Sequence, residues 1–173
     1  MTIVNRLTEC IRDVPDFPRK GIIFRDLTPV LEQPALFGEL ITALVAPWRD
    51  AGLTRIAAIE SRGFLFGAPM ALELGIGLSL VRKAGKLPHQ TIRRAYQLEY
   101  GEGVLELHVN TVSARDRVLI VDDLLATGGT AAAAAHLLRD AGAEVTGSAF
   151  VVELSGLEGR RHLQGRVEAL LHY

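Results

Sequence analysis

The chain has 173 residues, of which 49% are hydrophobic and 23% charged, and its formal net charge at pH 7 is −1. This length and composition predict one globular domain, residues 1–173, and exclude a disordered chain. The balanced charge gives no support to a nucleic-acid-binding protein, and the single cysteine, Cys10, excludes an internal disulfide and a cysteine zinc cluster.

The N-terminal stretch MTIVNRLTECIRDV lacks the apolar run of a signal peptide. The most apolar stretch, residues 64–81, contains Glu73, a proline and several glycines, and therefore suits a helix, a turn and a strand better than a membrane span. We expect a cytoplasmic protein that contacts no membrane.

The first part of the chain predicts two helices. Ile3, Leu7 and Ile11 recur every four residues, which is typical of an amphipathic helix over residues 2–12. The stretch PDFPRKG ends that helix and leads into a short apolar run. A second helix is expected over residues 35–51, where Pro47 should kink or divide it.

From residue 54 onward, apolar strands alternate with helices. Strands are expected in TRIAAIE, LSLV, RVLIV, EVTGSAFVVEL and VEALLHY, and helices over residues 64–74 and after residue 128. YQLEY and VLELHV flank Gly-Glu-Gly and predict a hairpin, whereas residues 82–95 are basic and show no hydrophobic period. This alternation predicts an α/β fold with a mainly parallel central sheet flanked by helices.

Two polar clusters, residues 60–63 and 122–130, follow strands of this predicted sheet. Ligands of such sheets bind beyond the carboxyl ends of the strands, so both clusters are expected to face one cleft. The second cluster is neither a Walker A loop nor a GxGxxG fingerprint. Its ATGGT stretch at a helix start favours an anion, and the preceding Asp-Asp pair suits sugar hydroxyls.

This pattern suits a ribose 5-phosphate, with the phosphate at the helix start and the diol at the carboxylates. A strand that simply ends in Asp-Asp before a Thr-capped helix is an equally good interpretation of the same residues. Local chemistry alone does not decide between the two.

VLIVDDLLATGGT resembles the ribose-phosphate signature of type I phosphoribosyltransferases. DFPRKGIIFRDLTPVL, ESRGFLFGAPMALELG, VRKAGKLP, YQLEYG and VVELSGLEGR resemble segments of adenine phosphoribosyltransferases, in the order of that family. The resemblance covers nearly the whole chain. It implies the type I phosphoribosyltransferase fold, with a small N-terminal hood over the base (residues 13–34) and a mobile loop and β-hairpin that form a lid (residues 82–109).

The implied reaction joins adenine to the sugar of 5-phosphoribosyl 1-diphosphate and gives AMP and diphosphate. The resemblance also implies a homodimer and a Mg²⁺ ion held mainly by the substrate rather than by protein ligands, in keeping with histidines that show no metal-ligand spacing.

The resemblance assigns a role to each candidate site residue. It implies that ribose and its 5-phosphate are bound by Asp122, Asp123, Ala126, Thr127, Gly128, Gly129 and Thr130. Adenine would be bound by Ile23, Phe24, Arg25 and Leu154, and the diphosphate by Arg62, Arg82, Lys83 and Lys86. Glu99 would be the acid/base group that takes the proton from adenine. A non-proline cis peptide is implied near Glu60-Ser61.

Without the resemblance, these residues have ordinary interpretations. Phe24 and Leu154 would be core side chains, Arg62 a surface arginine, and Glu99 an exposed strand carboxylate. Two other functions also stay open: a phosphoribosyltransferase for another base, and a non-catalytic sensor of 5-phosphoribosyl 1-diphosphate. The presence of Glu99 and the absence of a basic extension argue against the sensor.

Overall fold

The computed structural model describes residues 1–98 and 101–173, and the chain divides into two units, Met1–Ala43 and Leu44–Tyr173. The first unit contains α1 (Ile3–Cys10), a two-stranded antiparallel sheet of β1 (Arg12–Pro15) and β2 (Ile23–Asp26), α2 (Thr28–Leu31) and most of α3 (Pro34–Val45). The Thr2 side chain caps α1 by accepting a hydrogen bond from the Asn5 amide at 3.2 Å.

The predicted break at Pro47 is confirmed. The helix α3 ends at Val45, and Pro47 lies in the short 3-10 helix η1 (Ala46–Trp48) that follows. Proline has no amide hydrogen to donate to the preceding turn, so the regular helix ends there.

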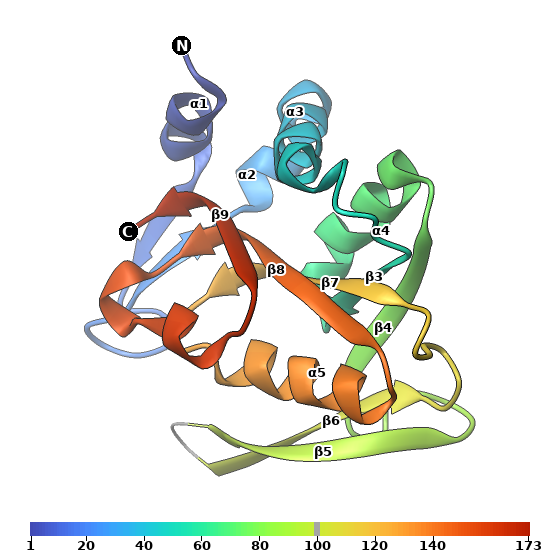
Figure 1. The fold of residues 1–173 in the computed structure, drawn as a ribbon. Helices are drawn as coiled ribbons and strands as arrows, with labels where there is room; N and C mark the ends of the chain where they lie inside the picture. The colour runs from blue at the N-terminus through green and yellow to red at the C-terminus, as the bar shows by residue number, and fades with distance from the viewer. Residues whose placement is uncertain (99–100) are drawn as a thin grey trace. The chain divides into compact units, whose positions relative to one another are not determined.

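The second unit is built on a seven-stranded sheet with the order β5-β6-β4-β3-β7-β8-β9 (Figure 1). Strands β4, β3, β7, β8 and β9 run parallel, and β6 pairs antiparallel with both β4 and β5. The elements are β3 (Arg55–Ile59), α4 (Gly63–Leu74), β4 (Gly77–Lys83), β5 (Thr91–Leu98), β6 (Gly101–His108), β7 (Arg117–Leu125), α5 (Gly129–Asp140), β8 (Glu144–Glu153), η2 (Ser155–Leu157), η3 (Gly159–His162) and β9 (Arg166–His172). The mainly parallel α/β sheet is therefore confirmed.

Alternate residues of β3 face two different helices. Ala57 and Ile59 belong to the core cluster that contains the alanines of α5. Their neighbours Ile56 and Ala58 contact α4 at Gly67, where a Cβ would come within 2.6 Å of the Ala58 Cβ. Successive strand side chains point to opposite faces, so α4 and α5 cover the two faces of the sheet.

The structure corrects two expected element boundaries. The strand β7 continues through Leu125, so Asp122 and Asp123 lie within it and not in the loop after it. Asp122 pairs with Phe150 of β8 and Leu124 with Val152, so the pairing with β8 continues on both sides of Asp123. The strand β5 begins at Thr91, so residues 91–95 form part of the hairpin with β6 although their side chains show no hydrophobic period.

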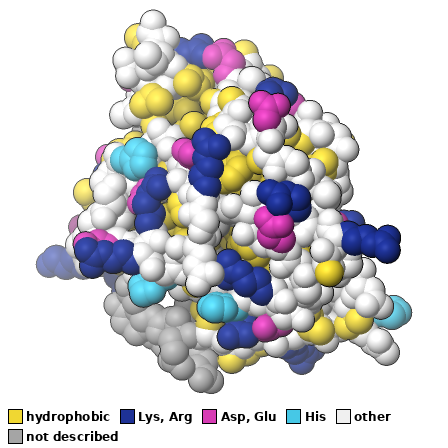
Figure 2. All heavy atoms as spheres, in the orientation of Figure 1, with side chains coloured by type: hydrophobic (Ala, Val, Ile, Leu, Met, Phe, Trp, Pro, Cys, Tyr) yellow, Lys and Arg dark blue, Asp and Glu magenta, His cyan; other side chains and the backbone are white. Residues whose placement is uncertain are grey.

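Charged side chains are dispersed over the face of the molecule shown in Figure 2. On the face that Figure 2 shows, Lys and Arg side chains are scattered, and several lie beside Asp or Glu. Over residues 1–98 and 101–173, no helix combines the length and the apolar character needed to cross a membrane.

Candidate active site

The candidate active site lies at the carboxyl ends of β3 and β7. These two strands are parallel neighbours, with Ala58 opposite Val121. The chain that leaves β3 forms the cluster Glu60-Ser61-Arg62, and the chain that leaves β7 forms the glycine loop before α5. The expectation that both polar clusters face one cleft is confirmed, because side chains from both line a single cavity of about 240 Å³. Its lining residues are Glu60, Ser61, Arg62, Lys83, Tyr96, Leu105, Asp122, Asp123 and Thr130.

A glycine brings the two loops into contact. The helix α4 begins at Gly63, where a Cβ would lie 2.7 Å from the Val121 carbonyl oxygen and 3.0 Å from Asp122 Oδ1. Such distances leave no room for any side chain. Gly63 therefore allows the first turn of α4 to approach β7, which sets Arg62 beside the two aspartates.

The two aspartates form a compact acidic pair. The Asp123 amide donates to Asp122 Oδ1 at 2.9 Å, and the Asp123 carboxylate forms an ion pair with Arg62, Nε to Oδ2 2.7 Å. Burial and the charge of Asp123 raise the pKa of Asp122 well above its usual value. Burial also raises the pKa of Asp123, although the Arg62 guanidinium opposes this shift. Ionisation of both carboxylates is therefore unfavourable in free energy, and a bound sugar or cation would reduce this cost.

The loop after β7 presents backbone amides. Gly128 is the N-cap of α5 with φ +82°, and no side chain caps this helix. The first amide groups of a helix have no partner within it and, with the helix dipole, favour an anion. Gly128 also lies against Gly159, since a Cβ on Gly128 would come within 2.4 Å of the Gly159 carbonyl oxygen.

The basic residues at the end of β4 and just after it are arranged differently from one another. Lys83 lines the cavity, whereas the guanidinium of Arg82 is held by Glu60, with Nε to Oε2 3.1 Å. Burial raises the pKa of Glu60, but the hydrogen bonds from Arg82 and the Lys83 amide, together with the charges of these two residues, outweigh this effect, so the pKa is lowered. Lys86 is exposed and is outside the cavity lining. The peptide bond Glu60-Ser61 is cis, as predicted.

The residues predicted to bind the base lie in both units. Ile23, Phe24 and Arg25 are on β2 of the first unit, and Leu154 follows β8 in the second. Ile23 is 50% exposed, and the Phe24 ring packs edge-on against Phe17 with a centroid distance of 5.2 Å. Arg25 forms an ion pair with Asp13. Their shared role in binding adenine stays a prediction.

Glu99, the predicted acid/base group, lies outside the described residues. Sequence reasoning missed three other contributors: Tyr96 and Leu105, which line the cavity, and Gly159, which packs against the loop after β7. The hairpin pattern could have suggested Tyr96, because it lies on a strand of the predicted lid. No local signal marks Gly159, because the residue it approaches, Gly128, is far away in the sequence: Gly128 precedes α5, and Gly159 begins η3.

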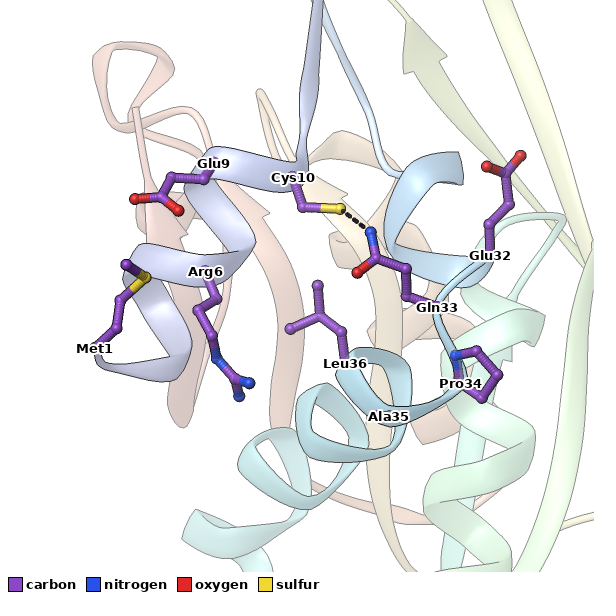
Figure 3. A pocket seen from close by; sticks show the side chains of 9 residues that line it. All are labelled: Met1, Arg6, Glu9, Cys10, Glu32, Gln33, Pro34, Ala35 and Leu36. Carbon is purple, nitrogen blue, oxygen red and sulfur yellow. Dashed lines mark hydrogen bonds between the residues drawn. The ribbon is translucent and has the colours of Figure 1, made fainter.

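A larger cavity of about 620 Å³ lies in the first unit, between α1 and the start of α3 (Figure 3). Figure 3 shows the Gln33 amide directed at Cys10, with Nε2 to Sγ 3.0 Å. Glu9 and Glu32 line this cavity. Arg6 is the one described lining residue with a cationic side chain, and it forms an ion pair with Glu39. These groups suit neither a phosphate nor a diphosphate.

Comparisons with known proteins agree with the geometry of the second unit. Residues 39–168 match the family described as "Phosphoribosyl transferase domain". An adenine phosphoribosyltransferase from Anaeromyxobacter dehalogenans is 56% identical over 164 residues, which is 94% of this chain and 95% of the relative. A second, from Methylococcus capsulatus, is 51% identical over 98% of this chain and 100% of the relative.

Solved structures extend this similarity to the fold. An adenine phosphoribosyltransferase structure from Thermoanaerobacter pseudethanolicus has a TM-score of 0.95 and 45% identity, and the match covers 98% of this chain and 99% of the other. The Saccharomyces cerevisiae enzyme, solved as a complex with an imino-altritol bisphosphate and adenine, has a TM-score of 0.93 and 41% identity, with 98% of each chain covered.

Proposed function

The chain belongs to the adenine phosphoribosyltransferase family, and we propose that it transfers the 5-phosphoribosyl group of 5-phosphoribosyl 1-diphosphate to adenine, giving AMP and diphosphate. One observation carries the proposal: an acidic pair, Asp122 and Asp123, shares a cavity with Arg62 and Thr130 at the ends of two parallel strands. Carboxylates suit the ribose hydroxyls, and cations with helix-start amides suit the phosphates.

The sugar is held at both ends by neighbouring parts of one segment. Asp122 and Asp123 accept hydrogen bonds from the ribose hydroxyls, and the residues of the loop from Ala126 to Thr130 donate to the 5-phosphate. As the bond from C1 to the diphosphate oxygen breaks, the ribose ring gains positive charge. Negative charge on the two aspartates stabilises that state more than the ground state, which is the condition for catalysis.

A Mg²⁺ ion fits this site if substrate oxygens provide most of its ligands. Among the residues that the structure describes, no group of three or more His, Cys, Asp or Glu side chains could hold a metal. Asp122 and Asp123 are the acidic side chains next to the predicted ribose position, and they would hold the ion through the sugar hydroxyls. When bound, the ion would supply positive charge to the departing diphosphate.

The diphosphate leaves towards cationic side chains. Arg62 and Lys83 both line the cavity, on the loop after β3 and at the end of β4. Arg82 lies beside Lys83 and binds Glu60, which lines the same cavity. Lys86 belongs to the predicted lid, as Arg82 and Lys83 do. Closure of this lid would exclude water, which could otherwise hydrolyse the activated sugar.

Adenine attacks C1 through a ring nitrogen and loses a proton. We assign the proton transfer to Glu99, because the LEYG stretch that contains it resembles the corresponding segment of the family. Ile23, Phe24, Arg25 and Leu154 would hold the base, with the Phe24 ring stacked on it. We further propose that the enzyme is a cytoplasmic homodimer that serves purine salvage.

Diphosphate release tests the proposal directly. The protein is mixed with Mg²⁺ and 5-phosphoribosyl 1-diphosphate, and adenine, hypoxanthine, guanine and orotate are offered separately. Release with adenine alone is the expected result. Release with another base would refute the specificity, and binding of the sugar diphosphate without release for any base would favour a sensor.

A further inference from the structure

Glu106 is a fully buried acidic residue near the end of β6, with 0% of its surface exposed. Its neighbours Leu105 and Leu107 are buried as well, at 1% and 0%. A buried carboxylate is costly unless hydrogen bonds or opposite charges satisfy it. Glu106 is not part of the predicted site, so the identity of its partners indicates what it does.

Those partners come from the segment that connects β4 to β5 and from the first residues of β5. Glu106 Oε1 accepts hydrogen bonds from the amides of Lys86 at 2.8 Å and Leu87 at 2.7 Å. Its Oε2 accepts from Thr91 Oγ1 at 3.4 Å and from Arg93 Nε at 3.2 Å. One carboxylate therefore binds both ends of the segment, on each side of Pro88.

The charge of Glu106 is favoured by these contacts. Burial raises the pKa of Glu106, but backbone hydrogen bonds from Leu87, Gly85 and Lys86, together with the charge of Arg93, outweigh it, so the pKa is lowered. Glu106 is thus ionised at neutral pH. Hydrogen bonds to a charged acceptor are stronger than those to a neutral one.

The other side of the same turn is tied to the active site. The Lys86 carbonyl accepts a hydrogen bond from Arg82 Nη1 at 2.7 Å, and the Arg82 guanidinium binds Glu60. Glu60 Oε2 also accepts from the Lys83 amide at 3.0 Å. Glu106 and Glu60 therefore hold the end of β4 and the turn that follows it, from Arg82 to Leu87, between them, and Glu60 lines the cavity.

We propose that Glu106 is a positioning residue that fixes the turn from Arg82 to Leu87, so that Lys83 faces the position of the departing diphosphate. This inference rests on the proposed function, which assigns the diphosphate to that side of the cavity. Glu106 touches no substrate and acts through the backbone of Lys86 and Leu87. Loss of the carboxylate removes the acceptor of the Leu87 amide and leaves the Lys86 amide only the Lys83 carbonyl at 3.3 Å, so the turn opens.

If Glu106 were needed only to build the hairpin, its loss would disrupt the pairing of β5 with β6. The hairpin of β5 and β6 is paired through its own backbone from Thr91↔His108 to Leu98↔Gly101, so it does not need Glu106 to form. The amides of Lys86 and Leu87 lie outside that pairing. A local opening of the turn is therefore expected, with the hairpin retained.

Trypsin cleavage of the ligand-free protein tests the opening. The bond between Lys86 and Leu87 carries the amide that Glu106 holds at 2.7 Å. Glu106→Gln should speed cleavage at that bond by about tenfold or more, measured by mass spectrometry, because local opening governs access. The matched control is Glu144→Gln, which removes an exposed carboxylate bound to Arg117 Nη1 at 2.7 Å and should leave the rate unchanged.

Steady-state kinetics test the positioning. Glu106→Gln should lower kcat/KM for 5-phosphoribosyl 1-diphosphate by about tenfold and change KM for adenine by less than about twofold. Unchanged cleavage in a folded variant would overturn the proposal, and so would faster cleavage with unchanged kcat/KM. If the wild-type protein releases no diphosphate with any base, the proposed function fails, while the cleavage experiment still decides whether Glu106 holds the turn.

A second variant covers the case in which Glu106→Gln does not fold. Arg93 is 59% exposed at its side chain, and Arg93→Gln removes one donor while Glu106 stays in place. It should speed cleavage between Lys86 and Leu87 in the same direction, by about twofold to fivefold, in keeping with one partly exposed charged contact. A rate equal to that of the wild type would overturn the proposal.

Discussion

Arg62 and Asp123 join the two loops of the candidate active site before any ligand is bound. Arg62 stands at the start of α4 and Asp123 within β7, and their side chains meet with Nε 2.7 Å from Oδ2. Arg62 is 46% exposed at its side chain and Asp123 only 7%. The exposed cation thus offsets a buried anion, and the loop predicted to bind diphosphate is held against the strand predicted to bind ribose.

Replacing both aspartates should impair catalysis severely. Asp122→Asn with Asp123→Asn keeps the side-chain shapes and removes the negative charge under the ribose. We expect kcat/KM for the sugar diphosphate to fall by at least about 10²-fold, the scale of a lost transition-state contact. Asp50→Asn, the same change at an exposed aspartate, is the control. A double variant with nearly normal kcat/KM would remove the assigned role.

The single substitution Asp122→Asn should stabilise the ligand-free protein. The raised pKa of Asp122 means that the folded state binds its proton more tightly than the unfolded chain, whose value is near 3.8. The ionised carboxylate therefore costs stability at neutral pH, and this cost is relieved as pH falls through the folded pKa. We expect the free energy of unfolding to rise by about 0.5–2 kcal/mol at pH 7.

Denaturant unfolding at two pH values checks this sign. The difference between Asp122→Asn and the wild type should be largest at neutral pH and should shrink towards pH 4. A variant that is less stable than the wild type at pH 7 would show that the carboxylate contributes net stability.

Two glycine substitutions separate backbone strain from crowding. Gly128 and Gly142 have φ values of +82° and +96°, but only Gly128 has a close neighbour, the Gly159 carbonyl oxygen at 2.4 Å from a Cβ. Gly142→Ala should cost about 1–2 kcal/mol of stability, from its left-handed backbone alone. Gly128→Ala should cost more and should also raise KM for the sugar diphosphate. Equal costs in thermal unfolding would mean that the contact with Gly159 is unimportant.

Glu99→Gln should lower kcat with little change in the affinity for either substrate. A general base contributes typically about 10²–10⁴-fold to turnover, so we expect a fall of that order. Single-turnover kinetics separate the chemical step from binding. Weaker binding of adenine with intact turnover would make Glu99 a binding residue instead.

The parts of the fold that were predictable depend on local pattern. Apolar runs between glycines predict the parallel strands, and Pro47 predicts the end of α3. The glycine loop after the Asp-Asp pair predicts the start of α5, which the structure begins at Gly129. In each case residues close in sequence determine the structure, so the sequence pattern is sufficient.

Contacts between distant segments could not be predicted in this way. The strand β7 continues through Asp122 because β8 pairs with it there, although aspartate is unfavourable in a strand. Residues 91–95 have no hydrophobic period because Arg93 and Arg94 bind Glu106 and Asp140. The ion pair of Arg82 with Glu60 likewise joins residues 22 positions apart.

The pairing of β3 with β7 also has a consequence for the order of synthesis. Arg55 lies opposite Val118, and the hairpin of β5 and β6 falls between them in the chain. On the ribosome, β3 can pair early with β4, but more than a further third of the chain must be made before β7 emerges, whereas the hairpin can pair as soon as it leaves the exit tunnel. Long-range pairing of this kind is slow compared with local pairing. The cleft between the ends of β3 and β7 thus cannot assemble until β7 has emerged, and a truncated chain that stops before β7 lacks both aspartates of the predicted ribose site.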